Sequence, residues 1–214
     1  MAPRDAVSSL WDTGTGEFYS LARLVQRALT GRITPDHLAA ECDAQLTRLQ
    51  SLGVRVAHLD SHRHVHALPA IWKPVTLAAR RAGVAAIRVP RVSFVSGGGG
   101  GGIHPGRLLV AASLRAALLF AKGPRNDRDL LRTDYFLGPG LLGARHFQRR
   151  LLALLDQLQP GTTELVVHPG HVDRDLAAWD SYTAPREREL AALCSREVRE
   201  RLARGDILLV PRRT

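Results

Sequence analysis

The first clear pattern of apolar positions predicts a helix that begins after Thr34 and ends near Gly53. Thr34 followed by Pro35 is typical of an N-cap and the first helical position. Apolar side chains then recur at intervals of four, four and three residues, which is the spacing of one helix face. The residues that carry this spacing are Leu38, Cys42, Leu46 and Leu49.

Short apolar runs follow this helix and predict buried strands. Residues 54–59 form such a run, which ends at Asp60, and residues 84–89 form another. Between them, residues 69–81 begin with a proline and stop before Gly83, as a helix does. A strand, a helix and a strand joined by short links indicate parallel βα units, in which the helix crosses over the sheet.

The second half of the chain repeats this alternation less regularly. Helices are expected over residues 107–121 and 144–158, with turns over residues 135–143. The remaining expected elements are a strand at residues 163–167, a helix at residues 185–204 and a strand at residues 207–210. The whole pattern predicts an α/β protein.

Six consecutive glycines interrupt the pattern at Gly97 to Gly102. No helix or strand interior tolerates such a run at low cost, so residues 96–102 are interpreted as a flexible surface loop. A phosphate-binding loop is the alternative. The Gly-Lys-Ser/Thr ending of a P-loop does not occur there, and neither does the spaced dinucleotide fingerprint.

The candidate chemistry is concentrated in residues 58–66, where four histidines and Asp60 all occupy even positions. In an extended strand these side chains would share one face, but they would be too far apart to surround one ion. The chain must therefore bend after Asp60. This would place Asp60, His62 and His64 at the carboxyl end of a strand, where parallel α/β folds carry ligand and catalytic groups. A polar loop with solvated histidines is the alternative.

A second candidate follows the expected strand at residues 163–167. It consists of His168, Pro169, Gly170 and His171, with Asp173 close behind. On its own, this sequence is equally compatible with an ordinary turn. Because the carboxyl ends of parallel strands meet on one face, we expect His62 and His168 to face one another across a common cleft.

The length and composition of the chain limit the number of domains and the kinds of protein that it could be. With 214 residues and 45% apolar content, the chain can bury one substantial core, so a single domain over residues 1–214 is expected. No signal peptide or membrane-spanning run is recognisable, which favours a cytoplasmic protein. Cys42 and Cys194 have no metal-site or disulfide spacing and are expected to be buried.

The net charge of +10 raises nucleic-acid binding as an alternative function. The arginines are spread along the whole chain rather than gathered in one stretch. This distribution makes nucleic acid an unlikely partner, although a strongly salt-dependent affinity for DNA or RNA would reveal one.

Residues 58–69 resemble the H-L-D-S-H-x-H-V-H-x-L-P signature of YdjC-like carbohydrate deacetylases, a family that includes chitooligosaccharide deacetylases. Further matches follow the family's order along almost the whole chain. They are Glu41, Gln45, Arg88, the segment 161–164 before His168, Arg186, and Glu189 with Leu190.

The resemblance implies a TIM-barrel-like (β/α) barrel of the polysaccharide-deacetylase type. It also implies hydrolysis of the acetamide of an N-acetylated sugar, with a divalent metal, Mg or Zn, as cofactor. By the same resemblance, His62 is a metal ligand with His64 as the alternative, and His168 protonates the leaving amine. Asp60 would orient a neighbouring imidazole, and Arg88 would position a carboxylate or the substrate. A homodimer is a further expectation.

The sequence departs from the family pattern at its beginning. The N-A-D-D-F-G and G-x-H-L-x-L motifs, which supply the base and two further metal ligands in the family, do not occur here. We therefore expect a chain that lacks the first βα units, binds metal weakly and is poorly active or inactive. A non-catalytic protein of the same fold is the corresponding alternative.

Overall fold

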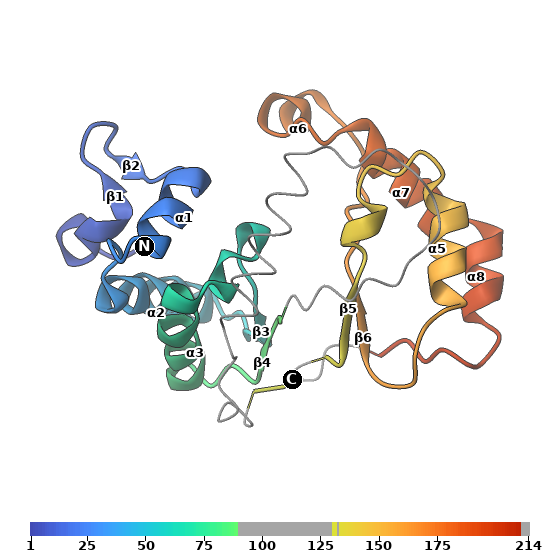
Figure 1. The fold of residues 1–214 in the computed structure, drawn as a ribbon, viewed down its shortest axis with the longest axis horizontal. Helices are drawn as coiled ribbons and strands as arrows, with labels where there is room; N and C mark the ends of the chain where they lie inside the picture. Colours follow the sequence, from blue (N-terminus) through green and yellow to red (C-terminus); the bar gives the residue numbers. More distant parts are fainter. Residues whose placement is uncertain (90–129, 132, 211–214) are drawn as a thin grey trace. The chain divides into compact units, whose positions relative to one another are not determined.

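The computed structural model describes residues 1–89, 130–131 and 133–210 (Figure 1). These residues fall into two compact units, one holding residues 1–89 and 130–131 and the other residues 133–210. The glycine-rich segment at residues 96–102 and the helix expected at residues 107–121 lie outside the described residues. The expectation of a single domain stays a prediction.

The first unit is built mainly from helices. In chain order its elements are η1 (Arg4–Leu10), β1 (Trp11–Asp12), β2 (Glu17–Phe18), α1 (Leu21–Leu29), α2 (Pro35–Ser51), β3 (His58–Leu59), η2 (His62–Ala67), α3 (Pro69–Arg81) and β4 (Ala86–Ile87). The two helices expected from the sequence are confirmed. α2 has Pro35 in its first turn, and α3 has the predicted bounds.

The strands β3 and β4 pair in parallel, with His58 opposite Ala86 and Leu59 opposite Ile87. Leu131 extends this ladder through a parallel bridge to Ala86. The helix α3 lies between the two strands in the chain, so the expected parallel βα unit is confirmed. Both strands are shorter than predicted, and the run at residues 54–59 is not buried. Val54 is 46% exposed, because only the last two residues of that run pair in the described part of the chain.

One face of α3 forms the centre of the first unit's core. Ile71, Trp72 and Val75 are buried together with Val7 of η1 and Ile87 of β4. Their spacing on α3 is that of a single helix face, although Pro69 and Gly83, rather than this spacing, were the basis for predicting the helix. Ile87, the last residue of β4, is thus buried in this core directly before Arg88.

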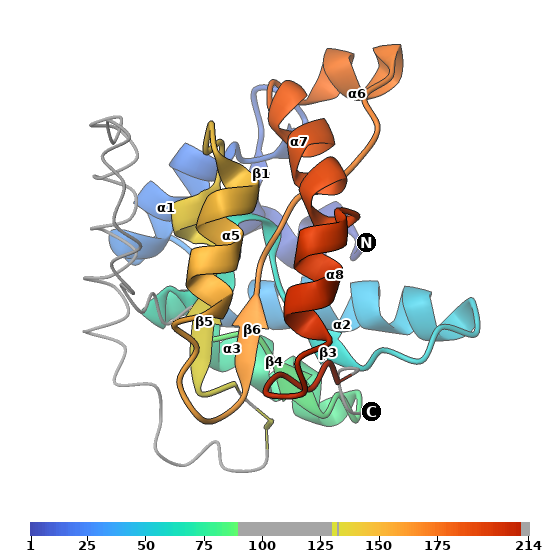
Figure 2. The same ribbon diagram turned by 90° about the vertical axis from the view of Figure 1, so that its right-hand side faces the viewer.

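The second unit contains one parallel strand pair and a group of helices (Figure 2). Its elements are β5 (Tyr135–Leu137), η3 (Pro139–Leu141), α5 (Phe147–Leu155), β6 (Thr163–Leu165), α6 (Arg174–Trp179), α7 (Ala184–Leu193) and α8 (Arg196–Leu202). α5, α7 and α8 pack against one another around Phe147, Leu151, Ala192 and Val198.

Three sequence predictions for this unit are wrong. Residues 135–143, expected as turns, begin with the strand β5, because Tyr135 pairs with Thr163 across the unit. The helix expected at residues 185–204 is split, since the Ser195 side chain accepts a hydrogen bond from the Val198 amide and starts α8. Residues 207–210 form no strand in the described structure, and Leu208 is 84% exposed.

The described strands form three separate two-stranded sheets, β1–β2, β3–β4 and β5–β6. The α/β class and the parallel pairing of β3–β4 and β5–β6 are therefore observed, whereas a closed barrel is not shown. Within the described residues, no helix combines the length and the apolar character needed to cross a membrane.

The expectation that both cysteines are buried is only half right. Cys42 packs partly buried against the first unit's core, and burial, with the neighbouring Asp43 and Glu41, raises the pKa of its thiol to about 11. Cys194 is exposed, because it lies at the end of α7 where the predicted long helix breaks.

Candidate functional site

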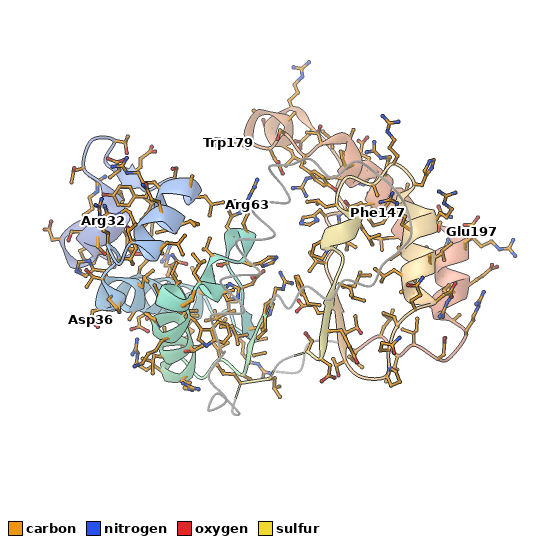
Figure 3. The ribbon with its side chains drawn as sticks, viewed as in Figure 1. Arg32, Asp36, Arg63, Phe147, Trp179 and Glu197 are labelled. Atoms are coloured by element: carbon orange, nitrogen blue, oxygen red, sulfur yellow. The ribbon has the colours of Figure 1, made fainter. Side chains whose placement is uncertain are left out.

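The histidine-rich segment bends directly after Asp60. β3 ends at Leu59, and η2 begins at His62 with Arg63 and His64 in the left-handed backbone region, at φ of 51° and 59°. Residues other than glycine adopt this region rarely, so the bend is a strained and specific feature. Arg63 is exposed on this bend (Figure 3). The expected change of direction after Asp60 is confirmed.

Asp60 lies at the centre of a group of charged side chains. Its Oδ1 lies 3.0 Å from Nδ1 of His64, and its Oδ2 accepts a hydrogen bond from Nη1 of Arg88. Asp60 and Arg88 each follow one of the paired parallel strands β3 and β4. The strand register therefore brings these residues together from positions 28 residues apart.

The Asp60 carboxyl is held ionised by its neighbours. Burial by itself would raise its pKa, but this effect is outweighed by hydrogen bonds from His64 and the Ser61 amide and by the charges of His64 and Arg88. Together they lower the pKa from its ordinary value of 3.8 to about 2. An ionised Asp60 can accept a hydrogen bond from the protonated Nδ1 of His64 and so orient that ring.

His66 has a structural position that the sequence did not reveal. Its side chain is almost completely buried, with Nε2 2.7 Å from the carbonyl oxygen of Arg88 and Nδ1 2.7 Å from Oγ of Ser61. A carbonyl only accepts, so Nε2 carries the hydrogen and Nδ1 accepts from the Ser61 hydroxyl. Burial lowers the pKa of His66, which favours this neutral form. Even spacing alone could not separate His66 from His62 and His64.

His62 is exposed on the same bend. In residues 1–89, 130–131 and 133–210, no group of three or more His, Cys, Asp or Glu side chains could hold a metal ion. The described residues therefore do not complete a metal site, and the assignment of His62 or His64 as a ligand stays a prediction.

The ion pairs of Asp60 predict a pH-dependent contribution to stability. A carboxyl whose folded pKa is depressed stabilises the fold above its unfolded pKa, and this contribution is lost as the pH falls through the folded pKa. In metal-free buffer at pH 5, the wild type should have a higher free energy of unfolding than the Asp60→Asn variant, as measured by urea titration. The expected difference is up to about 2 kcal/mol after allowing for solvent screening.

The stability difference between these two proteins should shrink as the pH is lowered from about 4 towards 2, where the carboxyl becomes protonated. Asp36→Asn, which removes an exposed carboxylate at the start of α2, is the control for the loss of one negative charge. A difference between wild type and Asp60→Asn that does not change with pH would contradict the argument.

In the second unit, His168 follows β6 and its backbone is anchored from α7. The His168 amide donates a hydrogen bond of 2.5 Å to Oε2 of Glu189, which is only 1% exposed. The Tyr182 hydroxyl donates to Oε1 of the same carboxyl and accepts from the Gly143 amide at 2.8 Å. The rings of His168 and Tyr182 meet edge to face at 5.7 Å.

Arg186, in the first turn of α7, supports the same turn. Its carbonyl accepts a hydrogen bond from the Gly170 amide, and its guanidinium donates to the Tyr182 carbonyl and to Oδ2 of Asp180. The sequence indicated Arg186 and Glu189 only through the family resemblance. Nothing in it indicated Tyr182 or Asp180, because their partners are set by the packing of α7 against the turn.

The candidate residues thus form two groups, each within one unit. Asp60, His64 and Arg88 contact one another in the first unit, while His168 is held by Glu189 and Tyr182 in the second. The shared cleft for His62 and His168 stays a prediction. Each group lies at the carboxyl end of a parallel strand, which is where ligand-binding groups are found in α/β proteins.

Imidazole and carboxyl groups clustered at the carboxyl ends of parallel strands are typical of the ligand-binding sites of α/β proteins. The model of the YdjC-like protein family matches residues 1–204, so the chain belongs to this family.

Among curated proteins, a carbohydrate deacetylase of Geobacillus stearothermophilus is 29% identical over 184 residues, which is 86% of this chain and 61% of the relative. A chitooligosaccharide deacetylase of Yersinia pestis is 29% identical over 202 residues, 94% of this chain and 68% of the relative. A carbohydrate deacetylase of Brevibacillus brevis is 26% identical over 82% of this chain and 60% of the relative. The chain spans about 60% of the length of several of these relatives.

Proposed function

We propose that this chain takes part in the deacetylation of a carbohydrate, by hydrolysis of the acetamide of an N-acetylated sugar. The observation that carries the proposal is the contact group of Asp60, His64 and Arg88 at the ends of two parallel strands, in a chain of the YdjC-like family. The names of the relatives, carbohydrate deacetylase and chitooligosaccharide deacetylase, support this reaction and substrate class.

The side chains suit distinct steps of amide hydrolysis. The sugar amine is a poor leaving group until it is protonated, and the imidazole of His168 is a suitable acid near neutral pH. Glu189 holds the backbone of His168 through a hydrogen bond, and Tyr182 contacts its ring. In the first unit, Asp60 accepts from Nδ1 of His64, which places the lone pair of that ring on Nε2. The hydrogen bonds from His64 and the Ser61 amide, with the charge of Arg88, keep Asp60 ionised for this contact.

A divalent metal, Mg or Zn, is part of the proposal, with His62 and His64 as its ligands from this chain. Two imidazoles are fewer than the three protein ligands of a typical catalytic zinc site. The described residues supply no third ligand beside them. We therefore expect residues 1–214 to bind divalent metal weakly and to turn over slowly. The barrel expected from the family resemblance stays part of the proposal, supported by the parallel register of β3–β4 and β5–β6.

The test measures acetate release from N-acetylated chitooligosaccharides by the 214-residue protein, with and without added Mg²⁺ or Zn²⁺. Calorimetry of the same protein measures the affinity for each ion. The expected result is slow, metal-stimulated acetate release and a metal affinity that falls further in the His62→Ala and His64→Ala variants. Arg63→Ala, an exposed replacement on the same bend, is the matched control.

Two other results would change the assignment. No acetate from any N-acetylated sugar, at any metal concentration, would favour a non-catalytic member of the family. Metal-independent turnover, unaffected by replacing His62 or His64, would show that the metal assignment is wrong.

A further inference from the structure

An open hollow lies between α5 and α7 in the second unit, away from any residue assigned to the proposed reaction. Its volume is about 520 Å³, within the range of pockets that bind small molecules. Its apolar lining includes Phe147, Leu152 and Ala192, which belong to or pack against the unit's core. The two helices pack directly against each other, so the hollow belongs to one folded unit (Figures 2 and 3).

Three arginines line this hollow, namely Arg145, Arg149 and Arg188, and no Asp or Glu does. Arg145 lies just before α5, and Arg149 lies in its first turn. Within the described residues, none of the three side chains makes a hydrogen bond or an ion pair. Glu187, the neighbour of Arg188 in the sequence, is not among the lining residues. The hollow therefore concentrates positive charge that the described part of the chain does not neutralise.

Other arginines of this unit are paired with carboxylates. Arg186 contacts Asp180, Arg196 contacts Glu200, and Arg201 contacts both Asp156 and Asp206. The absence of such pairing around the hollow leaves the guanidinium donors of three arginines available to a ligand. Guanidinium groups bind planar carboxylates and phosphates through two parallel hydrogen bonds, which neutral ligands cannot match.

We propose that the hollow between α5 and α7 binds a small organic molecule through an oxyanion group, a phosphate or a carboxylate. The arginines hold the oxyanion, and the apolar lining contacts the body of the ligand. The small size of the hollow favours a small molecule over nucleic acid, whose backbone requires an extended basic surface.

This site does not depend on deacetylation, but a ligand there would contact the helix that supports His168. Arg188 lines the hollow, while the next residue of α7, Glu189, is buried and accepts the hydrogen bond of the His168 amide.

The experiment measures binding by calorimetry in metal-free buffer at about 150 mM ionic strength, where weak surface attraction is screened. The probes are inorganic pyrophosphate, citrate, and N-acetylglucosamine with and without a 6-phosphate. The test variant is Arg149→Gln with Arg188→Gln. The control variant is Arg196→Gln with Arg199→Gln, which removes the same charge from exposed positions on α8.

The wild type and the control variant should bind the phosphorylated or carboxylated probes, with no binding of neutral N-acetylglucosamine at this site. The test variant should bind them at least about tenfold more weakly, because it loses charged hydrogen bonds from two arginines. Citrate binding without phosphate binding, or the reverse, identifies which oxyanion the hollow prefers. All three proteins should give the same circular dichroism spectrum, since the replaced residues are exposed.

Three results would overturn the proposal. Equal loss of affinity in the test and control variants would show that only the overall positive charge attracts the probes. Absence of binding by the wild type would exclude the site. Binding of duplex DNA without binding of any small probe would assign the arginines to nucleic acid. None of these binding measurements requires acetate release. The binding test therefore remains valid even if the protein does not deacetylate any sugar.

Discussion

Replacing His168 by Asn should lower the rate of acetate release by about 10² to 10⁴-fold, the range over which general acid catalysis contributes. The asparagine amide cannot donate a proton to the sugar amine near neutral pH. The replacement keeps the backbone amide that donates to Glu189, so the turn after β6 should retain its position. The measurement is kcat for acetate release at saturating substrate, corrected for the rate without protein.

The matched control for His168 is His146→Asn, an exposed histidine in the same unit. This variant should retain the wild-type kcat and unfold at the wild-type urea concentration. His168→Asn should lose about 1 kcal/mol of stability with its ring contact to Tyr182, too little to unfold the protein under assay conditions. A His168→Asn protein with undiminished kcat would show that another group protonates the leaving amine.

Replacing Glu189 by Ala should destabilise the second unit by about 2–4 kcal/mol. The replacement leaves the His168 amide and the Tyr182 hydroxyl without their acceptor, and it opens a cavity at a position that is 1% exposed. Glu189→Gln should cost less, because its amide oxygen can still accept one of the two hydrogen bonds. The free energy of unfolding in urea measures both effects.

Glu187 provides a close control, since it is an exposed carboxyl two residues earlier on the same helix. Glu187→Ala should change the free energy of unfolding by no more than about 0.5 kcal/mol. Equal destabilisation by the Glu187 and Glu189 replacements would mean that the buried hydrogen bonds to His168 and Tyr182 contribute nothing measurable.

Helices with a regular apolar face were predictable because their pattern is local. α2 appears where the spacing of apolar residues and Pro35 placed it, and α3 appears where Pro69 and Gly83 placed it. The strands were harder, since a strand is defined by its partner. Tyr135 was assigned to a turn because its partner, Thr163, lies 28 residues further along the chain. The apolar run at residues 207–210 has strand character, yet no described strand pairs with it.

The candidate site shows the same division. The sequence by itself placed Asp60, His62, His64 and His168 at strand ends, because motifs and strand boundaries are properties of the local chain. Only the tertiary structure decided which of these side chains meet. The register of β3 with β4 brings Arg88 to Asp60. Glu189 of α7 meets the backbone of His168, and Tyr182, just before α7, meets its ring.

His66 illustrates the physical reason. It shares the spacing of its neighbours, but the bend at Arg63 and His64 turns it into the core, where Ser61 and the Arg88 carbonyl satisfy both ring nitrogens. Burial then favours its neutral form and gives it a structural role. A linear pattern records which groups are near in the chain. The three-dimensional fold determines which are desolvated and which find partners, and those two conditions set the chemistry of each imidazole.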